Sequence, residues 1–73
     1  MKLSYNTMKI LKRHFNENKY RINNDELEIS LQDLCMIILI LQDKQSRLHN
    51  NDVKSAIEEL KEFQKQYTVR DIF

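Results

Sequence analysis

The longest apolar run in the chain covers residues 34–41 and contains no polar residue. It lies within a helical pattern from about residue 30 to residue 47, and Ser30 with Asp33 forms a capping pair at its start. A helix at the edge of a domain needs an apolar stripe only ~100° wide, whereas this one is apolar on every side. We therefore predict a central helix that the rest of the chain covers incompletely.

Two further helices are predicted on either side of this run. Residues from about 5 to 17 place Met8, Leu11 and Phe15 on one face. Residues from about 52 to 67 place an apolar arc, interrupted only by Gln64, opposite a charged face. The short loop before residue 52 makes the second and third helices antiparallel neighbours.

The connection at residues 19–29 has two interpretations. Apolar residues alternate with charged ones on both sides of Asn23-Asn24-Asp25-Glu26, which is rich in turn formers. This pattern is typical of a short β-hairpin. The alternative is an irregular connection that buries Ile22, Leu27 and Ile29. The fold class is all-α (mainly α): one three-helix domain over residues 1–73, with a short β-hairpin between helices 1 and 2 as one option.

The segment at residues 68–73 is an apolar tail that ends in Ile72 and Phe73. Apolar surface left in water forgoes about 25 cal/mol per Å² of burial. We therefore expect Ile72 and Phe73 to dock, either on the domain's own core or on a second copy of the chain.

Composition excludes several classes of function. The chain has no glycine, so Gly-rich phosphate-binding loops cannot form. Cys35 is the single cysteine, so no disulfide can form within the chain, and its apolar setting predicts a buried, reduced thiol. The apolar run is far shorter than the ~20 residues that span a bilayer, and no targeting segment is visible. These features predict a cytoplasmic protein with no membrane contact.

Catalytic chemistry is not expected. His14 and His49 lie at the ends of different predicted elements, and neither has a partner for acid–base work or zinc binding. The carboxylates near the middle of the third helix belong to a solvated face interleaved with lysines. We predict no catalytic residue, no cofactor and no metal, and hence no enzyme.

Charge is distributed unevenly. Residues 1–21 carry six basic residues and one acidic one, whereas residues 22–73 carry six basic and ten acidic residues. A basic first helix suggests contact with nucleic-acid phosphates, although a solvated face gives the same pattern, and the acidic third helix does not suit base reading. The residues that would contact phosphate are Lys9, Lys12, Arg13 and Lys19.

Size connects these observations to function. A chain of 73 residues buries only about 60% of its unfolded surface, so the central helix is expected to keep an exposed apolar patch, unless the 19–29 connection wraps it. We predict a small non-catalytic protein-binding regulator that self-associates as a homodimer and acts by occupying a partner protein's surface. Phage- and plasmid-encoded modulators often have this size. The residues predicted at the partner or self-association surface are Met36, Ile37, Ile40, Ile72 and Phe73.

Two alternatives remain open from the sequence. One is a small DNA-associated regulator that uses its basic N-terminal helix. The other is an accessory subunit whose core is completed by a larger complex.

Overall fold

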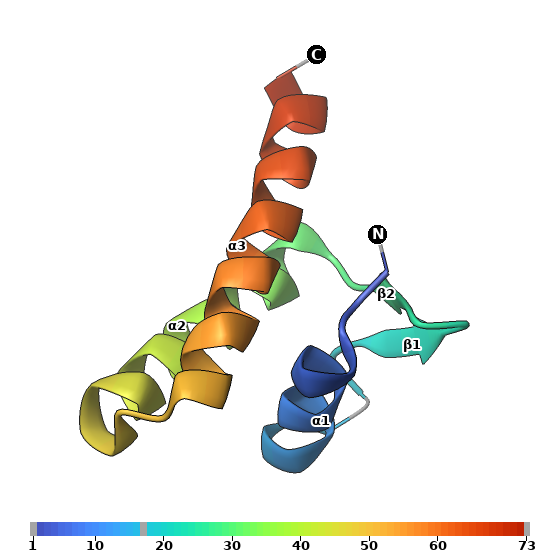
Figure 1. The fold of residues 1–73 in the computed structure, drawn as a ribbon. Helices are drawn as coiled ribbons and strands as arrows, with labels where there is room; N and C mark the ends of the chain where they lie inside the picture. Colours follow the sequence, from blue (N-terminus) through green and yellow to red (C-terminus); the bar gives the residue numbers. More distant parts are fainter. Residues whose placement is uncertain (1, 17, 73) are drawn as a thin grey trace.

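The computed structural model describes residues 2–16 and 18–72, with side chains as far as residue 66. Three helices and one hairpin follow each other in the order α1 (Tyr5–His14), β1 (Arg21–Asn23), β2 (Glu26–Glu28), α2 (Leu31–Leu48) and α3 (Asn51–Ile72) (Figure 1). The mainly α, three-helix fold class is confirmed, and so is the hairpin between α1 and α2.

Helix α1 is shorter than predicted at its C-terminal end. Ser4 caps its start, where the Ser4 Oγ accepts a hydrogen bond from the Thr7 amide at 3.3 Å. The helix ends at His14 because Phe15 turns to an extended conformation, with φ −135° and ψ 151°. The Phe15 side chain packs against the core from that position. The prediction that the helix reaches residue 17 was therefore wrong.

The hairpin has a two-residue turn at Asn24 and Asp25. Both residues have positive φ, 53° and 65°, which is the backbone that tight hairpins require and that asparagine and aspartate tolerate. The resulting register pairs Ile22 with Leu27, and their side chains both pack toward the core. The chain start lies beside this hairpin, because the Leu3 amide donates to the Asp25 carbonyl at 2.8 Å.

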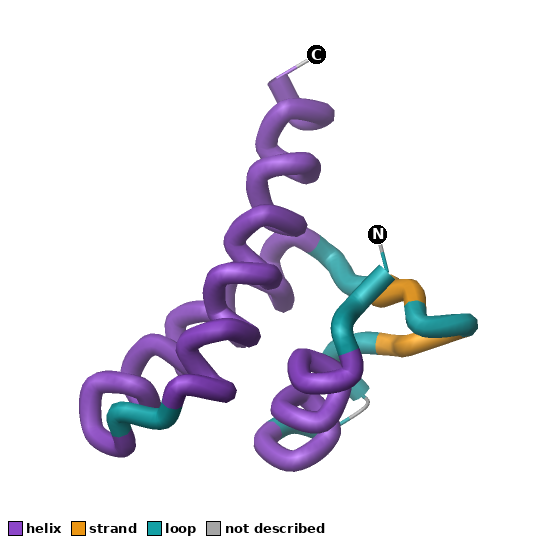
Figure 2. The backbone as a smooth tube through the Cα atoms, viewed as in Figure 1, coloured by secondary structure: helices purple, strands orange, loops and turns teal. Residues whose placement is uncertain are grey.

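The core forms around α3, against which both α1 and α2 pack. Figure 2 shows α3 between the longer α2 and the short α1 with its hairpin. The sequence suggested α2 as the central helix, but α3 holds that position because its regular apolar arc can contact a helix on each side. The buried apolar side chains are Leu3, Ile10, Leu11, Tyr20, Leu27, Leu34, Ile37, Ile38, Leu41, Val53, Ala56, Ile57, Leu60 and Phe63.

Polar contacts fix α1 on α3. The Ser4 amide and hydroxyl both donate to the Glu59 Oε1, at 3.0 and 3.3 Å. The Asn6 side-chain amide donates to the Asp52 carbonyl at 2.9 Å. Because the Glu59 carboxylate lies at the N-terminal end of α1, it also lies at the positive end of that helix dipole.

Helix α3 begins earlier and ends later than predicted. Its first turn is capped by Asn50, whose Oδ1 accepts from the Asp52 amide at 2.8 Å, where the sequence suggested Asn51 or Asp52 as the cap. At the other end the helix continues to Ile72, because no glycine or proline interrupts it. The segment predicted as a tail is helical as far as Ile72. The predicted docking of Ile72 and Phe73 lies outside the described side chains.

Candidate protein-interaction surface

Helix α2 is closely defined at both ends. The Ser30 Oγ accepts from the Asp33 amide at 3.2 Å and donates to the Asp33 carboxylate at 3.0 Å, so the predicted capping pair forms. At the C-terminal end His49 adopts a left-handed conformation with φ 50°, and its amide donates to the Gln45 carbonyl at 2.9 Å. These caps fix where the helix begins and where it ends.

One side of α2 is buried and the opposite side is open. Leu34, Ile37, Ile38 and Leu41 lie in the core. Three large apolar side chains point the other way and remain exposed, at 44% for Met36, 65% for Leu39 and 40% for Ile40. We call these three residues the α2 face. Large apolar side chains gathered on one exposed helix surface are typical of an interaction site.

The predicted self-association residues divide between these two sides. Met36 and Ile40 belong to the α2 face, whereas Ile37 is only 2% exposed and packs in the domain's own core. Leu39, which the sequence reasoning missed, is the most exposed member of the face. The polar residues Gln32, Asp43 and Arg47 lie on the same side of the helical wheel, and this signal could have identified Leu39.

Polar residues border the α2 face along the helix. Toward the C-terminal end, an Arg47 guanidinium nitrogen lies 2.6 Å from the Asp43 Oδ2, and both side chains are about two-thirds exposed. An exposed pair at this spacing contributes at most ~0.5 kcal/mol to the helix. The pair places charged side chains beside the apolar α2 face, and protein interfaces have a similar polar rim around an apolar centre.

Cys35 lies between the α2 face and the core. It is half-buried, so it is less buried than the sequence suggested. The Gln64 Nε2 of α3 donates to the Cys35 Sγ at 2.9 Å. Gln64, the polar interruption in the apolar arc of α3, therefore contacts α2 instead of solvent alone.

The exposed side of α1 carries basic residues. Tyr5, Lys9, Lys12 and Arg13 share one face of the helical wheel and are all exposed. The Lys9 Nζ lies 5.8 Å from the centre of the Tyr5 ring, within cation–π range. Lys19, the fourth predicted phosphate contact, is exposed in the connection after α1. Among the described residues, none of the four predicted cations forms an ion pair.

The two histidines lie apart from each other, and one of them has a shifted pKa. His14 is half-buried in the last turn of α1, and burial lowers its pKa, with the nearby charges of Lys44 and Arg13 acting in the same direction. His49 lies in the loop after α2. Over residues 2–16 and 18–66, no three His, Cys, Asp or Glu side chains converge to hold a metal ion.

The pKa of His14 predicts a dependence of stability on pH. Because the folded-state value is below the unfolded value of about 6.5, the unfolded chain binds more protons as the pH falls through that value. Stability should therefore decrease from pH 7 toward pH 5.5, and His14→Gln should reduce the decrease. Urea denaturation across this range measures the effect, and an unchanged slope in the variant would exclude His14 as its source.

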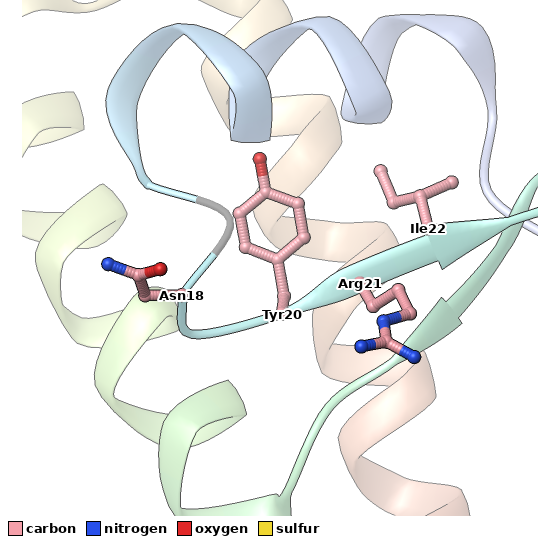
Figure 3. Close-up of a pocket in the computed structure, with 4 residues that line it drawn as sticks. All are labelled: Asn18, Tyr20, Arg21 and Ile22. Carbon is pink, nitrogen blue, oxygen red and sulfur yellow. The ribbon is translucent and has the colours of Figure 1, made fainter.

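A hollow beside β1 is lined by Asn18, Tyr20, Arg21 and Ile22. Figure 3 shows the Tyr20 ring rising from the start of β1 toward α1. Asn18 and Arg21 are exposed, Ile22 is half-buried and Tyr20 is buried.

The described part of the chain contains no helix that is both long and apolar enough to cross a membrane. The chain matches no protein-family model, no curated protein and no solved structure.

Proposed function

We propose that the chain is a small non-catalytic protein-binding domain that self-associates through the α2 face. The observation that carries this proposal is the exposure of Met36, Leu39 and Ile40 side by side on a capped helix. Burying such side chains against apolar atoms contributes about 25 cal/mol per Å². The proposal includes a regulatory role, in which the domain acts by occupying the surface of a partner protein.

A second copy is the occupant that the face itself suggests. A two-fold interface uses the same patch on both molecules, so it must be self-complementary. An apolar centre meets an apolar centre in such a pair, and the acidic and basic residues that flank it supply complementary charges. A single core in a chain of this size rarely supplies more than ~3–5 kcal/mol, so burying this face in a dimer also stabilises the fold.

Sedimentation equilibrium at micromolar concentration tests the proposal. We expect a reversible dimer, and Leu39→Lys should raise its Kd at least tenfold, since a buried lysine must lose its hydration. Leu48→Lys is the matched control because Leu48 is 62% exposed on the same helix but lies outside the α2 face. A wild-type monomer that binds no ANS would contradict the proposal, and so would an equal loss in both variants.

The basic side of α1 supports a second candidate function, contact with nucleic-acid phosphates. The supporting observation is that Lys9, Lys12 and Arg13 are exposed together, with no ion pair among the described residues and with Tyr5 beside them. Cations beside an exposed aromatic ring suit single-stranded nucleic acid. We rank this candidate second because exposed lysines on a helix are ordinary solvated residues.

Gel-shift titrations against salt separate the two candidates. We expect no complex with DNA at ~150 mM salt. A nucleic-acid-binding protein would instead bind with a steep salt dependence, and Lys9→Ala with Arg13→Ala would reduce the slope by about 2. Lys54→Ala with Lys65→Ala is the matched control, because both lysines are exposed and belong to α3 instead of α1. A tight complex at this salt that weakens only in the α1 variant would reverse our ranking.

A further inference from the structure

Charges of opposite sign lie at the two ends of α2, with the α2 face between them. Asp33 is in the first turn and Arg47 is in the last turn. Two parallel copies of this helix would place Asp33 near Asp33 and Arg47 near Arg47, and would align the two helix dipoles. Two antiparallel copies would place Asp33 of each near Arg47 of the other and would oppose the dipoles. The charge pattern therefore favours the antiparallel arrangement.

The position of Leu39 indicates where the two-fold axis of an antiparallel pair would lie. Gln32, Leu39 and Ser46 are spaced by seven residues, so they follow one flank of α2. In an antiparallel pair the same flank of both helices lies on one side of the interface, so Leu39 meets Leu39 of the second copy. In a parallel pair the flanks lie on opposite sides, and Leu39 would face the flank that carries Asp33 and Ile40. Both arrangements therefore bring apolar side chains together, and the charges at the two ends of α2 are what favour the antiparallel one.

We propose that a second copy docks on the α2 face with its own α2 antiparallel, about a two-fold axis beside Leu39. This inference rests on the proposed self-association and adds its geometry. Met36, Leu39 and Ile40 of both copies surround the axis. Arg47 already contacts Asp43, and its forked guanidinium has further donors for Asp33 of the second copy. A standard interface buries about 800 Å² per partner, so the polar residues along the helix must be part of this one.

Cross-linking measures the orientation directly. In a Cys35→Ala background, chains carrying Gln32→Cys are mixed with chains carrying Ser46→Cys and treated with a short bis-maleimide. Both positions are exposed. An axis beside Leu39 places position 32 of one copy opposite position 46 of the other, while two copies of position 32 lie about 21 Å apart along the helix. We expect a strong product in the mixture and little product from either variant alone.

The outcomes distinguish this inference from the proposed function. If the chain sediments as a dimer and the Gln32→Cys variant cross-links without the Ser46→Cys variant, the two helices are parallel. That result would overturn the orientation while leaving self-association intact. A dimer that gives no product in any sample would overturn the contact through α2. A monomer at every concentration would contradict the proposed function itself.

Charge reversal provides a second measurement of the orientation. Arg47→Glu should raise the dimer Kd about threefold to tenfold in the antiparallel pair, because two attractive contacts become repulsive. In a parallel pair the substitution would replace the repulsion between two arginines at position 47 with repulsion between two glutamates, so the Kd would stay the same. Asp33→Lys combined with Arg47→Glu should restore the original Kd, and a melting curve of each variant verifies that the fold is retained. A double variant as weak as Arg47→Glu alone would contradict the Asp33–Arg47 contact.

Discussion

Replacing Leu41 with alanine is expected to unfold a large fraction of the molecules at 25 °C. Leu41 is 0% exposed and packs in the core on the side of α2 that faces α3. Leucine-to-alanine substitutions at such positions cost about 2–5 kcal/mol, because they lose burial and leave a cavity. A core of this size rarely supplies more than ~3–5 kcal/mol in total, so the loss is comparable to the whole stability. Urea denaturation followed by circular dichroism measures it.

Leu48→Ala is the matched control for this substitution. Leu48 lies one heptad after Leu41 on the same helix, but it is 62% exposed. The two variants make the same change of side chain in the same helix, so the difference between them reports mainly the burial of Leu41. We expect Leu48→Ala to remain within about 0.5 kcal/mol of the wild-type chain. Equal losses at both positions would show that Leu41 is not in a well-packed core.

Removing the Glu59 carboxylate is expected to have the next largest effect. Glu59→Ala leaves the Ser4 amide and hydroxyl without the acceptor that holds the start of α1 on α3. Hydrogen bonds to charged groups contribute about 1.5–3 kcal/mol, and because this site is exposed we expect a loss of about 1–2 kcal/mol. The shift of the urea midpoint, with an unchanged m-value, measures the loss.

The chain offers a matched control at the preceding position. Glu58 carries the same charge on the exposed face of α3, so Glu58→Ala should change the free energy of unfolding by less than about 0.5 kcal/mol. Glu59→Gln keeps an acceptor oxygen and loses the charge, so its cost should lie between those of the two alanine variants. If Glu58→Ala and Glu59→Ala cost the same, the contact with Ser4 does not contribute to stability.

The sequence indicated those parts of the fold that depend on differences in polarity or residue type between near neighbours in the chain. The hairpin was one of two interpretations of residues 19–29, because apolar residues alternate on both sides of Asn24 and Asp25, and those two residues tolerate the positive φ that the turn needs. The capping pair of Ser30 and Asp33 was recognisable because the spacing alone determines it. In both cases the physical cause lies within a few residues of its effect.

The exposed side of α2 is not marked within the apolar run itself, and only the polar residues on either side of the run indicate it. A run that is apolar on every side contains no contrast, so nothing inside it distinguishes Ile37, which is buried, from Leu39, which is exposed. The rotation of the helix is set by its packing against α3. The end of α1 was missed for a related reason, since Phe15 fits the helical pattern but packs on the core from an extended backbone.

The contact between Ser4 and Glu59 spans a sequence separation of 55 residues, and this separation determines when the fold can be completed during synthesis. A ribosome adds about 5–20 residues per second, so Glu59 is made roughly 3–11 s after Ser4. Throughout that interval α1 has no α3 to pack against, and Ile10 and Leu11 stay uncovered on the nascent chain. The molecule is therefore expected to complete its fold only once α3 has emerged, and a chaperone that binds short apolar segments has those seconds in which to reach α1.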